Sequence, residues 1–167
     1  YANTNETFKG KINNWSCSGS GYTGTVNITK VGTGDWRLTG SNDYKGTTSI
    51  AGGRLIVNGT NSGTGQVIVA ADATLAGKGT VAGKVTVMAD ATVYAGDTLI
   101  NSQTLKLTGG CTINEGGAVE VPLYSSNGAT KCDRLQVTGN FQINGATLRL
   151  NMSETEGIKN DASFYIF

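Results

Sequence analysis

Histidine is missing from this chain of 167 residues, which also has one proline and three cysteines. Without histidine there can be no Ser/His/Asp triad, no cysteine–histidine pair and no imidazole ligand for a metal ion. The cysteines, Cys17, Cys111 and Cys132, are odd in number and lack metal-site spacing, so they do not predict a disulfide framework. We therefore expect neither an enzyme nor a bound cofactor or metal.

Long runs of charge and of apolar residues are also missing. Thirteen basic residues balance twelve acidic ones, for a net charge of +1, which does not favour binding to nucleic acid. No stretch approaches the roughly 20 apolar residues of a membrane-spanning helix, so we expect no membrane insertion by this segment. The sequence begins at Tyr1 and shows no signal peptide, which predicts a mature or trimmed piece of a longer chain.

Short alternating segments separated by glycine dominate the sequence. The chain has 25 glycines, and its Val, Ile, Leu and Thr residues alternate with polar ones over three to five positions, a pattern typical of short strands joined by tight turns. No window carries the apolar stripe of an amphipathic helix. These patterns predict an all-β protein.

One phrase is written twice. Residues 65–79 are followed by a near-copy at residues 83–97, so that Val67 matches Val85. A repeat this short buries its apolar side only against its neighbours. If each unit forms one turn of a coil, its strands pair with equivalent strands about 4.8 Å above and below. An antiparallel sandwich is the main alternative, but it does not explain the copied phrase.

The coil predicts rows of stacked side chains in the interior. One predicted row contains Leu55, Leu75, Val93, Val119 and Leu148. A second contains Val67, Val85, Leu105 and Leu135.

The two ends and one internal stretch fit the repeat less well. Residues 1–25 are predicted to be an irregular N-terminal start or cap, and residues 26–167 to be the solenoid. Within the solenoid, residues 122–131 are predicted to be a loop, because Pro122 cannot donate to a strand ladder and turn residues follow it. The last residues, Phe164-Tyr-Ile-Phe167, are predicted to form a strand.

Aligning the two late units separates the cysteines. Cys111 takes the place of Phe141 one unit later, so its side chain should point inward, whereas Cys132 matches Ser102 at the entrance to a different strand. Two sites on different sides of a coil do not come within the roughly 7 Å that a disulfide requires. We predict no disulfide between Cys111 and Cys132.

The segment 34–58 resembles the autotransporter-associated β-strand repeat. The residues in step with that family's pattern are Trp36, Leu38, Gly40, Asn42, Tyr44, Gly46, Thr48, Ile50, Gly53, Leu55 and Val57.

Residues 75–150 are similar to the passenger-associated transport repeat, through Leu75-Ala-Gly-Lys-Gly-Thr-Val81 and Asp133-Arg-Leu-Gln-Val-Thr-Gly. Both resemblances imply a right-handed single-stranded parallel β-helix, of about five to seven coils at this repeat length. They also imply a stalk segment of a secreted or cell-surface bacterial protein, beside adhesive or enzymatic modules of the same chain.

Three aromatic residues are candidates for stacking on a sugar: Trp15, Tyr22 and Tyr44. The alternative is that aromatics near the start cover the open end of the repeat stack. We favour this alternative for Trp15 and Tyr22, because the ends of a repeat stack need to be capped. Trp36 and Tyr44 occupy fixed steps of the repeat pattern, so both are predicted to be structural.

Asp72 and Asp90 occupy equivalent places in the copied phrase, where stacked carboxylates could hold Ca²⁺. The alternative is that each Asp closes a turn. The next unit has Glu115-Gly-Gly117 at this place, so we predict turns and no metal site.

Together these observations predict a non-enzymatic β-helical stem of an exported bacterial protein, with an adhesive role and a glycan or host-surface ligand as one extension. The alternative is an accessory carbohydrate-binding module of a glycan-degrading enzyme. A lyase that uses Asp72 and Asp90 is the third and least favoured hypothesis.

Overall fold

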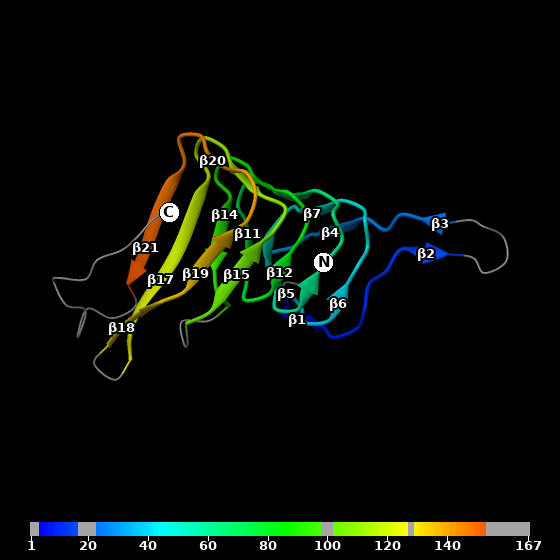
Figure 1. Ribbon diagram of the computed structural model, residues 1–167, viewed down its shortest axis with the longest axis horizontal. Coiled ribbons are helices and arrows are strands. Elements are labelled where there is room, and N and C mark those ends of the chain that lie inside the picture. Colours follow the sequence, from blue (N-terminus) through cyan, green and yellow to red (C-terminus); the bar gives the residue numbers. More distant parts are fainter. Residues whose placement is uncertain (1–3, 17–22, 98–101, 127–128, 153–167) are drawn as a thin grey trace.

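Parallel strands wind through three sheets in the computed structural model, which describes residues 4–16, 23–97, 102–126 and 129–152 (Figure 1). No residue in these ranges is helical. Consequently, none of the described segments is a helix that could cross a membrane. The predicted parallel β-helix is confirmed.

Sheet I is the largest sheet. Its strands follow the order β1-β5-β8-β11-β14-β17, with β18 and β21 both on β17, and all its pairs are parallel except β17–β18. The strands of sheet I are β1 (Glu6–Phe8), β5 (Asp35–Leu38), β8 (Gly53–Val57), β11 (Ala73–Gly77), β14 (Thr92–Ala95), β17 (Ala118–Ser126), β18 (Ala129–Cys132) and β21 (Thr147–Met152).

Sheets II and III complete each turn, and all their pairs are parallel. Sheet II contains β6 (Ser41–Asn42), β9 (Thr60–Asn61), β12 (Thr80–Val81), β15 (Thr104–Leu107) and β19 (Arg134–Val137). Sheet III contains β4 (Ile28–Lys30), β7 (Thr48–Ile50), β10 (Val67–Val69), β13 (Val85–Val87), β16 (Cys111–Ile113) and β20 (Phe141–Ile143).

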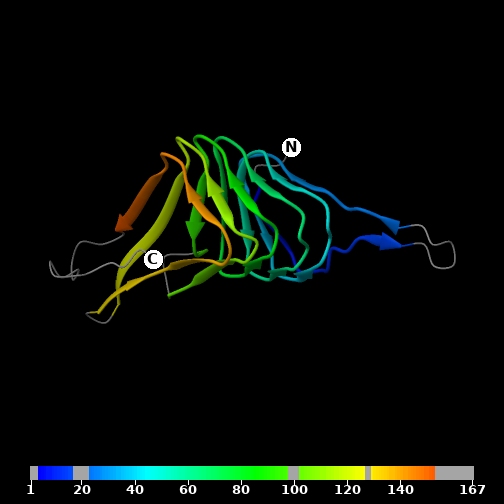
Figure 2. The same ribbon diagram turned by 45° about the horizontal axis from the view of Figure 1, so that its top comes forward.

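The chain visits the sheets in the order I, II, III and then repeats, as in the triplets β5–β6–β7 and β8–β9–β10. The turns are seen side by side in Figure 2. Some turns bring successive backbones very close together. A Cβ added to Gly59 would lie 2.1 Å from the carbonyl oxygen of Gly40, and one added to Gly79 would lie 2.0 Å from that of Gly59. Only glycine, which has no Cβ, fits at these stacked positions.

Two antiparallel hairpins interrupt the coil. The first pairs β2 (Trp15–Ser16) with β3 (Thr23–Gly24), and it projects from the N-terminal end of the stack (Figures 1 and 2). The second pairs β17 with β18. The predicted loop at 122–131 is therefore wrong, because strand pairing continues through most of this stretch. Pro122 is accommodated because it lies beyond Glu120, the last residue of β17 that pairs with β14.

Within the segment 1–25, β1 pairs in parallel with β5 and so adds a strand to sheet I. The strand predicted at Phe164–Phe167 lies outside the described residues.

The first predicted interior row is confirmed. Leu55, Leu75 and Val93 pair in register and are at most 1% exposed, and Val119 and Leu148 continue the same row. This stacking removes apolar surface from water along the length of the coil, which is the main force holding such a structure together.

The second predicted row is wrong, because it joins residues of two sheets. Val67 and Val85 belong to sheet III, where the next residue of their row is Cys111, whereas Leu105 pairs with Leu135 in sheet II. Strand β12 of sheet II contains only Thr80 and Val81, which are too few residues to show alternation in the sequence.

The two described cysteines are free, as predicted. Cys111 pairs with Phe141 in sheet III and is fully buried, whereas Cys132 is exposed at the end of β18. Cys17 lies outside the described residues.

Candidate functional site on the outer face of sheet I

The predicted stacking aromatics do not form one surface. Trp15 is 56% exposed on β2, where its indole covers the Gly24 backbone of the opposite strand. Tyr44 lies in the interior, only 1% exposed. Tyr22 lies outside the described residues. Among the described candidates, Trp15 alone can offer a ring to a ligand.

Tyr44 belongs to a polar group inside the coil. Its hydroxyl is 2.7 Å from Thr48 Oγ1 and accepts a hydrogen bond of 2.9 Å from Asn61 Nδ2. Burial is the main reason why the pKa of the Tyr44 hydroxyl is raised. A phenol buried with its hydroxyl satisfied is structural, so Tyr44 is not available to stack on a sugar.

The other aromatic of the repeat pattern, Trp36, pairs with Leu55 and packs partly buried against the core. This placement agrees with its predicted structural role.

Asp72 and Asp90 lie in turns with backbone φ angles of 59° and 60°. The residue that follows in register, Gly116, has a φ of 78°. Aspartate and glycine are among the few residues that tolerate this left-handed conformation. Asp72 N donates to Asp90 O, and Asp90 N donates to Gly116 O, both at 3.1 Å. The turn therefore explains both aspartates, and the described residues contain no cluster of metal-binding side chains.

The densest group of interacting charges lies on the outer face of sheet I. Arg37 Nη2 is 3.2 Å from Asp35 Oδ2 and 3.4 Å from Asp97 Oδ1. Arg54 Nη1 is 3.4 Å from Asp35 Oδ2. Asn58 Nδ2 donates a hydrogen bond of 2.8 Å to Asp97 Oδ2. We call these five residues, Asp35, Arg37, Arg54, Asn58 and Asp97, the outer network.

Strand alternation positions most of the outer network. On β5 and β8, Leu38, Leu55 and Val57 point inward, which leaves Arg37 and Arg54 on the outer face. Asp97 arrives differently. It follows β14, and Gly96 beside it forms an antiparallel bridge with Gly77. Asp97 thereby reaches Arg37, which lies 60 residues earlier in the chain.

The face under the outer network is closed to solvent. Ile56 and Ala76 follow Arg37 in the outward row, yet both are 0% exposed. An outward residue of a solvent-facing sheet would not be buried. Gly96 and Asp97, which follow β14, lie against this side of the sheet: Gly96 pairs with Gly77 of β11, and Asp97 contacts Arg37 of β5 and Asn58, which follows β8.

The charged region continues along sheet I. The Arg54 guanidinium lies over the Tyr94 ring, 5.5 Å from its centroid, in a cation–π contact. Burial, and then the negative charge of Glu120, raise the pKa of Tyr94.

Asp133, which precedes β19, is linked to Asp97 through Gln103 and is only 1% exposed. Its Oδ1 accepts a hydrogen bond of 2.7 Å from Gln103 N, and Gln103 Oε1 accepts one of 2.7 Å from Asp97 N. Among the described residues, Asp133 Oδ2 has no hydrogen-bond partner, and it lies 2.1 Å from where a Cβ on Gly96 would be. Burial raises the pKa of Asp133, an effect that the hydrogen bond from Gln103 opposes.

This arrangement fits a structural brace, which holds strands of sheet I together, better than a reaction centre. The carboxylates of Asp35 and Asp97 are engaged by arginine or asparagine side chains, so neither is free to act as a base. The sequence indicates the outward positions of Arg37 and Arg54 through alternation. It contains no local signal for Asp97 as their partner, because a connection rather than a strand register brings them together.

Comparison with known families agrees with the repeat structure. The family model of the passenger-associated-transport-repeat matches residues 28–57, which run from the start of β4 to the end of β8. This match falls mainly on the segment that resembles the β-strand repeat, upstream of residues 75–150. Neither a curated protein nor a solved structure matched the chain. The chain therefore carries a passenger-associated transport repeat, and the match covers one complete turn of its β-helix, β4–β6, together with β7 and β8 of the next.

Proposed function

We propose that this chain is a structural stem of an exported bacterial passenger protein, a rigid segment that holds neighbouring modules apart. The observation that carries this proposal is the unbroken interior row from Leu55 to Val119, in which every member is at most 6% exposed. A stack of this kind has no hinge between its turns. The passenger-associated transport repeat supports a secreted or surface-exposed location in a bacterium.

In this proposal the segment itself performs no reaction. The sequence contains no histidine. The titratable groups that cluster on sheet I are joined to one another or buried against backbone. Chemistry and binding then belong to other modules of the longer protein.

Trp15 favours a second candidate function, which is contact with a glycan, either as an adhesin or as a carbohydrate-binding module. Its indole is the most exposed large hydrophobic side chain among the described residues. It lies on a hairpin that projects beyond the stack (Figure 1). Exposed aromatic rings on a projecting element can stack on sugar rings. Its contact with Gly24 leaves the Trp15 side chain more than half exposed.

A glycan array separates the two candidates. Wild-type protein and Trp15→Ala are compared on the same array, and the melting temperature of each is recorded. The stem proposal expects no binding above background for either protein. If the wild type bound a glycan and Trp15→Ala abolished that binding at an unchanged melting temperature, the adhesive function would replace the stem proposal.

A further inference from the structure

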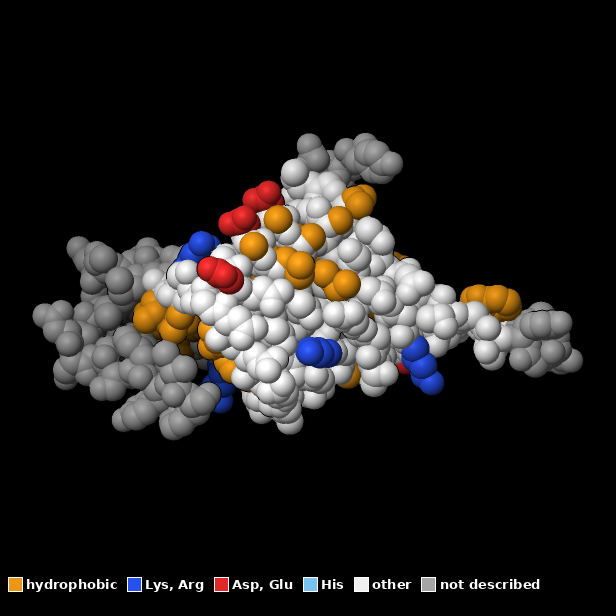
Figure 3. Space-filling model, turned by 90° about the horizontal axis from the view of Figure 1, so that it is seen from above, with side chains coloured by type: hydrophobic (Ala, Val, Ile, Leu, Met, Phe, Trp, Pro, Cys, Tyr) orange, Lys and Arg blue, Asp and Glu red, His pale blue; other side chains and the backbone are white. Residues whose placement is uncertain are grey.

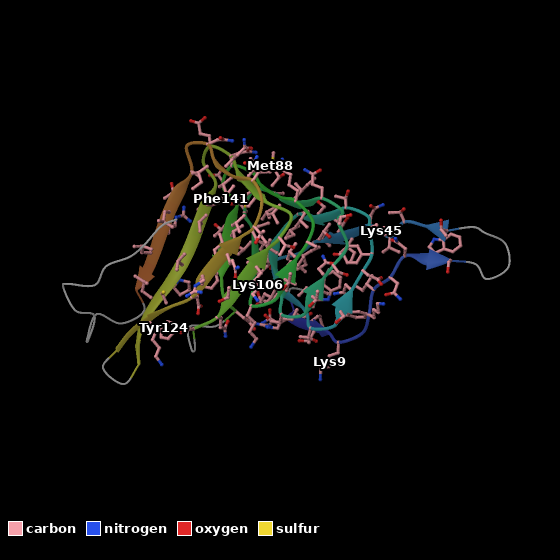
Figure 4. The ribbon with its side chains drawn as sticks, viewed as in Figure 1. Lys9, Lys45, Met88, Lys106, Tyr124 and Phe141 are labelled. Atoms are coloured by element: carbon pink, nitrogen blue, oxygen red, sulfur yellow. The ribbon has the colours of Figure 1, made fainter. Side chains whose placement is uncertain are left out.

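The C-terminal end of the β-helix has an open apolar face. Phe141, Ile143 and Leu148 are 37%, 54% and 44% exposed, although they continue inward rows. The residues directly beneath them, Cys111, Ile113 and Val119, are 0%, 0% and 6% exposed. Figure 4 shows Phe141 at this end of the stack. Each of these side chains lacks the layer that covers its counterpart one turn earlier.

Backbone groups also face the open side. Arg134 N and Thr138 N each donate a bond of 2.8 Å to β15, to Gln103 O and Leu107 O. Because amides alternate in direction along a parallel strand, those of Leu135 and Val137 point away from β15. They point to where the next strand of sheet II would lie.

The order of the chain specifies which segment comes next. From β5 onward the chain enters sheet II after sheet I, as from β14 to β15 and from β17 through β18 to β19. The last described strand, β21, belongs to sheet I. The segment after it should therefore lie on β19.

Spacing selects a candidate strand. In sheet II, Thr104 pairs with Arg134, 30 residues later. The residue 30 positions beyond Arg134 is Phe164, which begins the apolar segment Phe164-Tyr-Ile-Phe167. In this register Tyr165 falls on Leu135 and Phe167 falls on Val137.

We propose that Phe164–Phe167 adds to β19 as a parallel strand and closes the apolar end of the β-helix, with Tyr165 and Phe167 pointing inward. An aromatic from this side can span the narrow interior. Tyr44, which follows the sheet II strand β6, already does so, because its hydroxyl contacts Thr48 on β7 of sheet III. Tyr165 and Phe167 would in the same way cover Phe141 on β20.

The chain's own segment fits this face better than a second copy. It follows the sheet order and direction of the earlier turns and the 30-residue spacing of the turn before it. A second copy stacked head to tail would have to present its N-terminal end, where the β2–β3 hairpin projects (Figure 2).

Hydrogen exchange on the full chain tests the proposal, read at the amides of Leu135 and Val137. The variant Tyr165→Asp/Phe167→Asp removes the inward side chains, and the matched control Phe164→Asp/Ile166→Asp removes the outward ones. We expect exchange at both amides to speed up by about tenfold or more in the first variant and to stay within about twofold in the control, because a strand that detaches exposes the amides it had bonded.

Three results would overturn the proposal. Rapid exchange at Leu135 and Val137 in the wild type would show that no strand covers them. A larger effect in the control than in the first variant would assign the opposite register. Wild-type protection that falls on dilution would assign the face to a second copy, and size-exclusion chromatography would then show a dimer.

Discussion

At the scale of single residues, Asp90 illustrates how a turn can imitate a metal site. Its φ of 60° explains an aspartate without any ligand, because the side chain tolerates a left-handed backbone. We expect Asp90→Gly to change the free energy of unfolding by less than about 0.5 kcal/mol, and Asp90→Ala to lower it by about 1 kcal/mol. Urea titration measures both. A melting temperature that rises with calcium in the wild type but not in Asp90→Gly would instead establish a metal site.

The two described cysteines should differ sharply in reactivity. Burial raises the pKa of the Cys111 thiol to about 12, so almost no thiolate forms at pH 8. Cys132 is exposed. We expect iodoacetamide at pH 8 to modify Cys132 in the native protein, and Cys111 only after unfolding, as read by peptide mass spectrometry without reductant. A mapped peptide that joins the two cysteines would contradict the structure.

Within the strands, one interior row offers a matched pair of substitutions. Leu75 is fully buried in the middle of the row, and Leu148 is 44% exposed at its end. We expect Leu75→Ala to lower the free energy of unfolding by about 3 kcal/mol, because it leaves a cavity in the narrow core, and Leu148→Ala to lower it by less than about 1 kcal/mol. Similar losses in urea titrations of the two variants would mean that this row does not form the core.

The outer network should couple strands that are not neighbours. Asp97 contacts Arg37 on β5 and Asn58 beyond β8, although it follows β14. In a double-mutant cycle with Arg37→Met and Asp97→Asn, we expect a coupling free energy of about 0.5 to 1 kcal/mol. The control is the cycle of Arg37→Met with Lys78→Met, which should show no coupling, because Lys78 is exposed between β11 and β12. Equal coupling free energies in the two cycles would show that the outer network does not hold these strands together.

The strands show what a sequence of this kind reveals. The row from Leu55 to Leu148 and the inward position of Cys111 follow from alternation and spacing, which the repeat preserves. The failures occur where the repeat changes length. Two-residue strands such as β12 carry too few residues to show alternation. The hairpin at 118–132 contains a proline that ordinarily signals a loop.

The outer network was less predictable than the core, for a physical reason. Inward rows are set by strand register, which is local and periodic. Asp97 instead reaches its partners through a connection, and the sequence does not encode the path of a connection as a period. The same limit applies to Tyr44, whose pattern position was visible but whose burial depends on Thr48 and Asn61.

At the scale of the whole molecule, uncharged groups dominate the face of the stack that is seen from above. Uncharged polar side chains and backbone cover most of this face, with apolar side chains among them and few charged ones (Figure 3). Asp72 and Asp90 are exposed acidic residues in the turns before β11 and β14. An extended stack with such a surface is suited to holding neighbouring modules apart, as the stem proposal requires.

The central claim is that successive turns stack in register along sheet III. Thr29, Thr112 and Gln142 face outward at equivalent places on β4, β16 and β20, and β20 is the fifth neighbour from β4. Pairs of spin labels, placed by cysteine substitution in a chain with Cys17→Ser and Cys132→Ser, measure their separations by pulsed electron paramagnetic resonance. The account predicts about 24 Å from Thr29 to Gln142 and about 5 Å less from Thr29 to Thr112. A Gln142 label no farther from Thr29 than the Thr112 label would contradict a parallel β-helix.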